Sequence, residues 1–223
     1  MGDRKENLIQ AFRWSYGLLG ATALVASYIF MMNGVHHAYG PLKAAGSVLR
    51  LFTNQSNLLV VMWVFYAILK KGKPDEHASF PVSLRGALGL YIGMTFLIHH
   101  FFLRDAYPVS GPNIAVNFIT HYVIPFAYLL DWLLTETRGI YRWKHIGYWM
   151  IYPTVYALIG FAVGVISGHF PYSFLDWHQQ SLGYIMMYGV AALVVFLMAS
   201  LLLVYLNKKL GYYSESMKPK TFQ

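Results

Sequence analysis

Six long apolar runs constrain the fold of this 223-residue chain more than any other feature. Each run is close to the length of about 20 residues that an α-helix needs to cross a bilayer. Because backbone N–H and C=O groups find no water inside a bilayer, apolar segments of this length cross it as helices. The sequence therefore predicts an all-α, polytopic membrane protein with six transmembrane helices, over residues 12–32, 49–69, 84–103, 114–134, 146–167 and 184–205.

The composition agrees with this class of protein. Hydrophobic residues make up 57% of the chain and charged residues 12%, a balance that excludes a water-soluble domain. Six spans with short connections use almost all of the chain, which predicts one transmembrane domain over residues 1–206 and a polar, basic cytoplasmic tail over residues 207–223. The first run has no small-residue cleavage site after a short core, so it is predicted to be a retained helix. The chain contains no cysteine, which excludes a disulfide framework and a cysteine nucleophile.

The basic residues predict the orientation. With the N-terminus inside, 14 of the 17 Lys and Arg residues fall in inner segments, and only Lys43, Arg50 and Arg104 fall outside. This bias predicts that both termini are cytoplasmic. It also accounts for the net charge of +8 without a nucleic-acid partner. The expected location is the cell membrane, with a bacterial plasma membrane favoured.

Polar side chains interrupt two of the apolar runs. The second run contains five consecutive polar positions, Thr53-Asn54-Gln55-Ser56-Asn57. The fourth run carries a stripe that must point into the bundle, formed by Asn117, His121 and Tyr128 with Asp131 at its edge. Polar groups at this depth face protein or water and commonly mark functional sites.

Thr53 and His121 are predicted to meet. Their two helices run in the same direction, and the two residues lie at similar depths in the outer half of the membrane. A threonine hydroxyl becomes a useful nucleophile when a neighbouring base takes its proton, and histidine is the usual base near neutral pH. The pair therefore predicts acyl transfer, with Thr53 as nucleophile and His121 as base.

The remaining site residues are predicted with less specific roles. Asn57 or Asn117 could stabilise an oxyanion, and Asp176 in the last outer loop could fold back to orient the imidazole. Asp131 lies too far inward for that role, and a basic residue among Arg138, Arg142 and Lys144 is its expected partner. The other residues expected to line the oxyanion site or pocket are Asn54, Tyr128, Tyr152, Tyr156 and His99.

Structural interpretations compete with these functional ones. A helical threonine commonly bonds the carbonyl one turn back, which is that of Leu49 here, and this carries about equal weight for Thr53. Asn54, Gln55 and Ser56 could simply bridge helices. Gly17 and Gly20, or Gly86 and Gly89, could pack helices within one chain or between chains, which leaves the oligomeric state open.

The ordered set of motifs resembles the androgen-induced-gene type of six-helix membrane proteins and their prokaryotic relatives. The resemblance covers nearly the whole chain and rests on residues 52–59 (FTNQSNLL), 80–84 (FPVSL), 121–126 (HYVIPF), 130–134 (LDWLL), 152–153 (YP) and 170–176 (FPYSFLD). Eukaryotic members are threonine hydrolases that cleave esters of fatty acids with hydroxy fatty acids, so the resemblance implies a lipid ester hydrolase without a cofactor.

Carried over by position, the nucleophile of this family matches Thr53 and its histidine matches His121. The surroundings of Thr53 are more polar than in the eukaryotic motif, and the Asp131-Trp132 pair resembles the prokaryotic branch. The outer loop has Ser173 where relatives tend to have proline. These departures leave the pair intact and leave the substrate open.

Two other classes of function compete. Seven of the nine histidines fall on or near the outer side, so a membrane protein that binds a metal or haem through histidine is an alternative: His36, His37, His99, His100, His121, His169 and His178. Against it, adjacent histidines on a helix point about 100° apart, and no His-x-x-x-His spacing occurs, so no metal site is predicted. The second alternative is a lipid-binding or transport protein that has the same polar pocket and performs no chemistry.

Overall fold

The structure is a computed structural model that describes residues 2–39, 46–70, 82–105, 109–168, 170, 172 and 175–216. Over this part of the chain it is all-helical and contains no strand. Six of its helical segments are long and apolar enough to cross a membrane. The predicted all-α polytopic fold is therefore confirmed.

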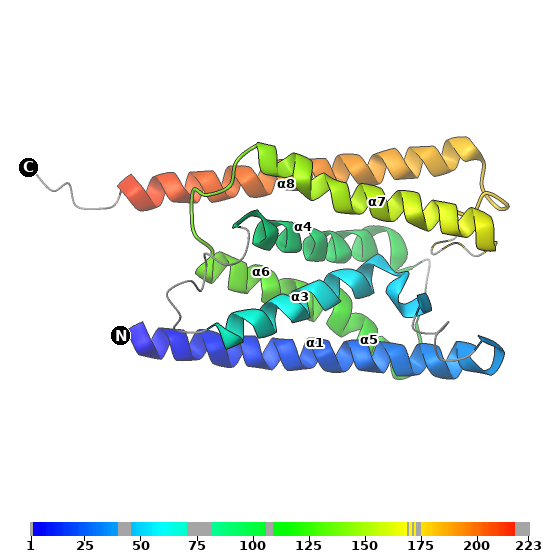
Figure 1. Ribbon diagram of the computed structural model, residues 1–223, viewed down its shortest axis with the longest axis horizontal. Helices are drawn as coiled ribbons and strands as arrows, with labels where there is room; N and C mark the ends of the chain where they lie inside the picture. Colours follow the sequence, from blue (N-terminus) through cyan, green and yellow to red (C-terminus); the bar gives the residue numbers. More distant parts are fainter. Residues whose placement is uncertain are drawn as a thin grey trace, which may run out of the picture. The chain divides into compact units, whose positions relative to one another are not determined.

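Figure 1 shows the order of the helices along the chain. The first two spans are α1 (Gly2–Tyr39) and α3 (Phe52–Leu69). The third is α4 (Val82–Ile98) with the π-helical turn η1 (His99–Leu103). The fourth joins α5 (Asn113–Phe118), the π-helical turn η2 (Ile119–Val123) and α6 (Ile124–Thr135). The last two are α7 (Lys144–Ser167) and α8 (Leu182–Ser216).

The predicted boundaries of the inner four spans agree with these helices to within a few residues. The first and last helices are longer than predicted. α1 is already helical at Gly2, and α8 continues to Ser216 through most of the segment that was predicted as a tail from residue 207. Residues 217–223 of that tail lie outside the described part of the chain.

The helices form two compact units. The first comprises residues 1–80 and 91–135, and the second comprises residues 81–90 and 136–223, as far as they are described. The first part of α4 thus belongs to the second unit and the rest to the first. The prediction of one transmembrane domain over residues 1–206 stays a prediction.

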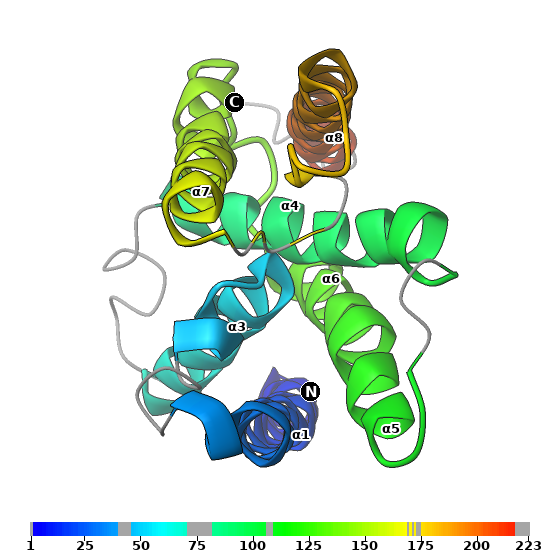
Figure 2. The same cartoon turned by 90° about the vertical axis from the view of Figure 1, so that its right-hand side faces the viewer.

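In the first unit, α1 lies along α3 (Figures 1 and 2). Two glycines allow this close approach, because a Cβ atom at Gly17 would lie 2.8 Å from Val64 and one at Gly20 would lie 2.8 Å from Val61. This glycine pair therefore packs helices within one chain. One side of the first helix faces the inside of this unit, since Tyr16 and Arg13 on α1 are buried.

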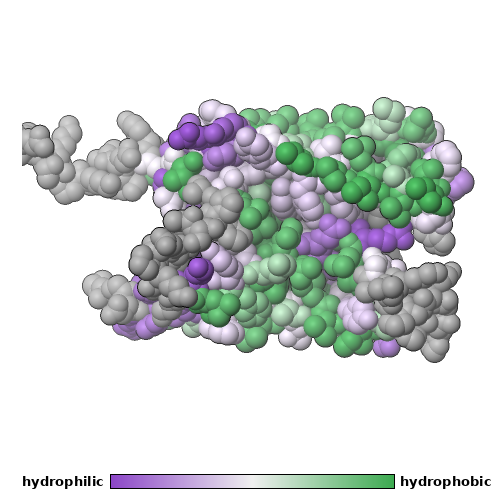
Figure 3. All heavy atoms as spheres, in the orientation of Figure 1, coloured by the Kyte–Doolittle hydropathy of each residue, from purple (hydrophilic) through white to green (hydrophobic). Residues whose placement is uncertain are grey.

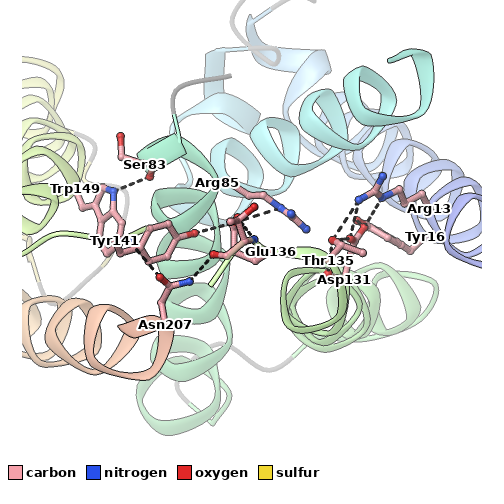
Figure 4. A network of polar contacts seen from close by, with 11 residues as sticks. Arg13, Tyr16, Ser83, Arg85, Asp131, Thr135, Glu136, Tyr141, Trp149 and Asn207 are labelled. Atoms are coloured by element: carbon pink, nitrogen blue, oxygen red, sulfur yellow. Dashed lines mark hydrogen bonds and ion pairs between the residues drawn. The ribbon is translucent and has the colours of Figure 1, made fainter. Parts of the chain in front are cut away.

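A buried ion pair joins α1 to α6 (Figure 4). Arg13 donates from Nε and Nη2 to the two carboxylate oxygens of Asp131, at 2.9 and 3.1 Å. The hydroxyls of Tyr16 and Thr135 donate to the same carboxylate at 2.8 Å each. The ion pair of Asp131 is thus with Arg13 of the first helix, in place of the expected pairing with a residue of 138–144. A bidentate pair with every oxygen hydrogen-bonded is the form in which buried charges are tolerated.

The second unit has its own polar network (Figure 4). Glu136 accepts a hydrogen bond from the Tyr141 hydroxyl at 2.6 Å and forms an ion pair with Arg85 at 3.7 Å. Trp149 of α7 donates to the carbonyl of Ser83 on α4 at 2.7 Å. Most of the surface of α7 and α8 is apolar and exposed, as expected for helices in contact with lipid (Figure 3).

Candidate active site

Thr53 lies in the first turn of α3, where the chain leaves the extended conformation of Leu51. Its Oγ1 is 3.1 Å from Nε2 of His121, a residue of η2. Both side chains are half-buried. The predicted meeting of Thr53 and His121 is therefore confirmed. The competing interpretation, a hydrogen bond from the Thr53 hydroxyl to the carbonyl of Leu49, is wrong. The hydroxyl of Thr53 bonds His121, and the carbonyl of Leu49 accepts a hydrogen bond from the side chain of Gln55 at 2.6 Å.

A π-helical turn carries His121. In η2 the hydrogen bonds span five residues, and the N–H of Ile124 bonds the carbonyl of Ile119. The turn ends just before Pro125, which lacks an N–H and cannot continue the α-helical pattern. The proline is thus preceded by a wider turn, and such turns are frequent at functional sites.

The backbone fixes the tautomer of His121. Its Nδ1 is 2.9 Å from the carbonyl of Asn117, one turn earlier, and a carbonyl can only accept. The Thr120 hydroxyl, 3.2 Å from Nδ1, donates its own proton to the Val116 carbonyl at 2.9 Å. Nδ1 therefore carries the proton, so Nε2 presents its lone pair to the hydroxyl of Thr53. A base held in this tautomer by a hydrogen bond on its far side is the arrangement that nucleophilic catalysis requires.

A second histidine packs on the first. The ring of His99, at the start of η1, stacks on the ring of His121 with a centroid distance of 3.8 Å and an interplanar angle of 26°. The side-chain amide of Asn117 lies 3.2 Å from Nε2 of His99. Asn117 thus contacts both rings, His121 through its carbonyl and His99 through its amide. Both histidines belong to π-helical turns of neighbouring spans.

The polar residues after Thr53 satisfy the backbone around it. Asn57 is fully buried, and its amide donates to the carbonyls of Thr53 and Thr120 at 2.8 and 3.0 Å. Both of its N–H groups are thus used, which corrects the prediction that Asn57 is an oxyanion donor. Asn57 instead connects α3 to the turn that carries His121. Asn54 donates to the carbonyl of Val48 at 2.9 Å, before the start of α3.

Of the other bridging candidates, Ser56 does join two helices. Its hydroxyl is 2.7 Å from that of Thr95 on α4. Gln55 instead satisfies the segment before its own helix. The five polar residues therefore make three kinds of contact. One side chain contacts His121, two bond neighbouring helices, and two bond the turn before α3.

The remaining predicted pocket residues are Tyr128, Tyr152, Tyr156 and Asp176. Tyr128 is buried against Trp63, with a centroid distance of 5.3 Å and an interplanar angle of 82°. Tyr152, Tyr156 and Asp176 belong to the second unit. The carboxylate of Asp176 accepts from the backbone N–H of His178 at 2.9 Å and the side chain of Gln179 at 2.8 Å.

The structure corrects the prediction that Asp176 orients the imidazole, because the ring nitrogen concerned has another partner. The atom it would bind, Nδ1 of His121, already donates to the carbonyl of Asn117. This orienting carbonyl was missed because backbone atoms leave no mark in a sequence. The available signal was the proline four residues after the histidine, which interrupts the regular helix there.

The described residues form no group of three or more His, Asp or Glu side chains that could hold a metal ion. His99 and His121 meet through their ring faces, whereas the lone pairs of an imidazole lie in the ring plane. The two rings therefore do not converge on one ion. His169 and the side chains of His36 and His37 lie outside the described part of the chain.

Comparison with known proteins adds one relative. A protein of Mycoplasma pneumoniae described as "Uncharacterized protein MG452 homolog" is 30% identical over 133 residues, which are 53% of this chain and 50% of that protein. The matched segment thus spans about half the length of this curated relative. No protein-family model matches the chain, and no solved structure matches it.

Proposed function

We propose that the protein is an intramembrane lipid ester hydrolase with Thr53 as nucleophile and His121 as general base. The observation that carries this proposal is the oriented contact between the two side chains. The lone pair of Nε2 faces the threonine hydroxyl, while Nδ1 is held by the carbonyl of Asn117. The two hydrogen bonds together hold the imidazole in the tautomer and the direction that a general base for Thr53 needs.

The geometry supports a two-step reaction. Oγ1 of Thr53 attacks the ester carbonyl as its proton passes to Nε2 of His121, and the imidazolium then gives that proton to the departing alcohol. The acyl group is left as an ester on Thr53. A water molecule attacks this ester with His121 again as base, which releases the carboxylic acid and restores the threonine.

The start of α3 supplies an oxyanion donor. The first N–H groups of a helix have no partner within the helix, and the N–H of Thr53 bonds no acceptor among the residues that the structure describes. A nucleophile's own N–H commonly stabilises the oxyanion in acyl transfer. We assign this role to Thr53 in place of Asn57, with the amide of Asn117 as a second donor if it turns from His99.

The substrate class follows from the setting and the resemblance. Apolar helices surround a half-buried polar pair, which suits an ester between long acyl chains. The motifs at residues 52–59 and 121–126 resemble the androgen-induced-gene type of threonine hydrolases, which supports esters of fatty acids with hydroxy fatty acids or similar lipid esters as substrates. The membrane would then be the cell membrane, from which the substrate enters.

Covalent labelling tests the proposal. Purified protein in detergent is treated with a fluorophosphonate probe, and wild type is compared with Thr53→Val and His121→Ala. Wild type is expected to be labelled, and both variants are expected to lose at least about 99% of the labelling rate, since a positioned base contributes about a hundredfold or more. Equal labelling of wild type and Thr53→Val would overturn the proposed nucleophile.

Matched controls separate the reaction from folding. Thr22 is a helical threonine whose hydroxyl bonds the carbonyl of Leu18 at 2.9 Å, so Thr22→Val removes a threonine without touching the pair. Thr53→Ser keeps a hydroxyl beside His121. Both variants are expected to keep most of the labelling. Metal and haem content measured on the same wild-type sample tests the metal-binding alternative, and a protein that binds lipid esters without cleaving them would support the transport alternative.

A further inference from the structure

Basic side chains gather where α7 begins and α8 approaches its end, within the second unit. Two come from the segment between α6 and α7, one is the first residue of α7, and two come from α8. In residues 136–148 and 200–211 the one carboxylate is that of Glu136, which is buried against Arg85 and Tyr141. This cationic surface is formed by Arg138, Arg142, Lys144, Lys208 and Lys209.

Asn207 holds the two segments together. Its side chain donates to the carbonyl of Thr137 at 2.9 Å and accepts from the N–H of Tyr141 at 3.1 Å. Its backbone carbonyl accepts from the N–H of Gly139 at 3.0 Å. Asn207 is fully buried, and Figure 4 shows its side chain between these contacts. The basic residues are thus carried by a hydrogen-bonded scaffold and not by independent loops.

Two glycines bring this scaffold close to α8. Gly139 adopts a φ of 77°, a left-handed conformation that favours glycine. A Cβ atom at Gly211 would lie 2.7 Å from the Cα atom of Gly139. The backbone of the loop therefore packs directly on the backbone of the helix, which fixes the spacing between the basic residues of the loop and those of α8.

Apolar surface adjoins the cations. Trp143 is half exposed, and Nζ of Lys208 lies 5.5 Å from the centroid of its ring. Tyr148 and Ile151 continue the exposed apolar surface along α7. Figure 3 shows hydrophilic side chains at this end of the helices and hydrophobic ones along the rest of their length. Exposed tryptophan beside lysine and arginine at the end of a span is typical of the headgroup region of a membrane.

We propose that this cationic surface is a binding site for the phosphate-bearing headgroup of an anionic phospholipid, with the acyl chains along α7. The adjoining apolar surface favours a lipid over free phosphate, because a soluble anion would use the cations alone. Clustered basic residues next to a span attract anionic lipids. The inference is independent of the proposed hydrolysis, since it uses only residues of the second unit.

Lipid binding to the full chain in detergent tests the site. Native mass spectrometry with phosphatidylglycerol and phosphatidylcholine gives the ratio of the two affinities. Wild type is expected to prefer phosphatidylglycerol by at least about tenfold, and the variant with Arg142, Lys144, Lys208 and Lys209 all changed to Gln is expected to lose this preference. Equal binding of the two lipids by wild type would overturn the proposal, as would displacement of phosphatidylglycerol by millimolar inorganic phosphate.

Two further variants separate a built site from surface charge. Arg4 and Lys5 are exposed basic residues at the start of α1, and the double change to Gln is expected to leave the preference intact. Asn207→Ala keeps all five cations and removes the side-chain bonds of the scaffold, so it is expected to reduce the preference several-fold. Gly211→Ala is also expected to reduce the preference, because the added methyl group separates the backbone of α8 from that of Gly139. Loss of preference in the Arg4 and Lys5 variant, or full preference in both scaffold variants, would contradict a built site.

Discussion

His121 has three contacts that define its chemistry, and each uses a different part of the ring. Nε2 meets the hydroxyl of Thr53, Nδ1 meets the carbonyl of Asn117, and one face stacks on His99. The first two contacts prepare the base. The third places an aromatic face beside a ring that becomes positively charged during the reaction, which is a favourable arrangement as long as His99 stays neutral.

Substitutions at His99 test the importance of this stack. His99→Phe keeps an aromatic face against His121, whereas His99→Ala leaves a void beside it. Hydrolysis of a fluorogenic fatty acid ester is expected to fall about tenfold or more in His99→Ala and much less in His99→Phe. Equal kcat values in the two variants would show that the aromatic face is not needed.

The buried pair of Arg13 and Asp131 has a role in stability. Asp131→Asn would leave the guanidinium of Arg13 buried without its counter-charge, which costs about 3–5 kcal/mol. Asp131 lies ten residues along the helix from His121, about 15 Å away, so the activity per folded molecule is expected to change little.

Denaturation of purified protein in detergent, followed by fluorescence, measures this loss. The double variant Arg13→Met with Asp131→Leu removes both charges and is expected to be clearly more stable than Asp131→Asn. A single variant as stable as wild type would show that the pair contributes nothing to stability.

At the level of the element, the fourth span is distinctive because it joins an α-helix, a π-turn and a second α-helix. The π-turn η2 is adjacent to Pro125, and η1 in the third span carries His99. Restoring regular α-helical bonds in η2 would rotate His121 relative to Asn117 and Thr53. The position of the base therefore depends on an irregular helix.

Pro125→Ala tests this dependence. Alanine supplies the missing N–H and has the highest helix propensity, so the fourth span is expected to become more regular and no less stable. The ester hydrolysis rate is expected to fall about tenfold or more because His121 moves away from Thr53. Wild-type activity in a folded Pro125→Ala protein would show that the π-turn does not position the base.

At the level of the whole molecule, the alternation of six spans predicts that the two ends of the chain share one side of the membrane. The absence of cysteine makes this simple to measure, because each introduced cysteine is the only one. Lys5→Cys and Lys209→Cys are expected to react with an impermeant maleimide only after the cells are opened, and Asp176→Cys is expected to react in intact cells. Reaction of Lys5→Cys and Lys209→Cys from opposite sides would contradict an even number of spans.

The sequence predicts the spans well because each span contains about 20 mostly apolar residues, and a few polar residues within it do not hide this pattern. It predicts the contact between Thr53 and His121 because both polar residues interrupt apolar runs at similar depth. It does not reveal the pairing of Arg13 with Asp131, because the order of helices around a bundle and their rotation are set by packing. It also misses the extension of α8, since Asn207 looks like the polar end of a helix but is buried as a bridge to the preceding loop.

The most direct test of the catalytic pair is the position of the covalent adduct left by a fluorophosphonate probe. Trypsin cleavage after Arg50 and Lys70 releases residues 51–70 as one peptide that contains Thr53. Fragmentation of this peptide by mass spectrometry is expected to place the adduct on Thr53, and no adduct is expected in His121→Ala. An adduct on Ser56 or on another peptide, or an unmodified wild-type protein, would contradict the assignment of Thr53 as the nucleophile.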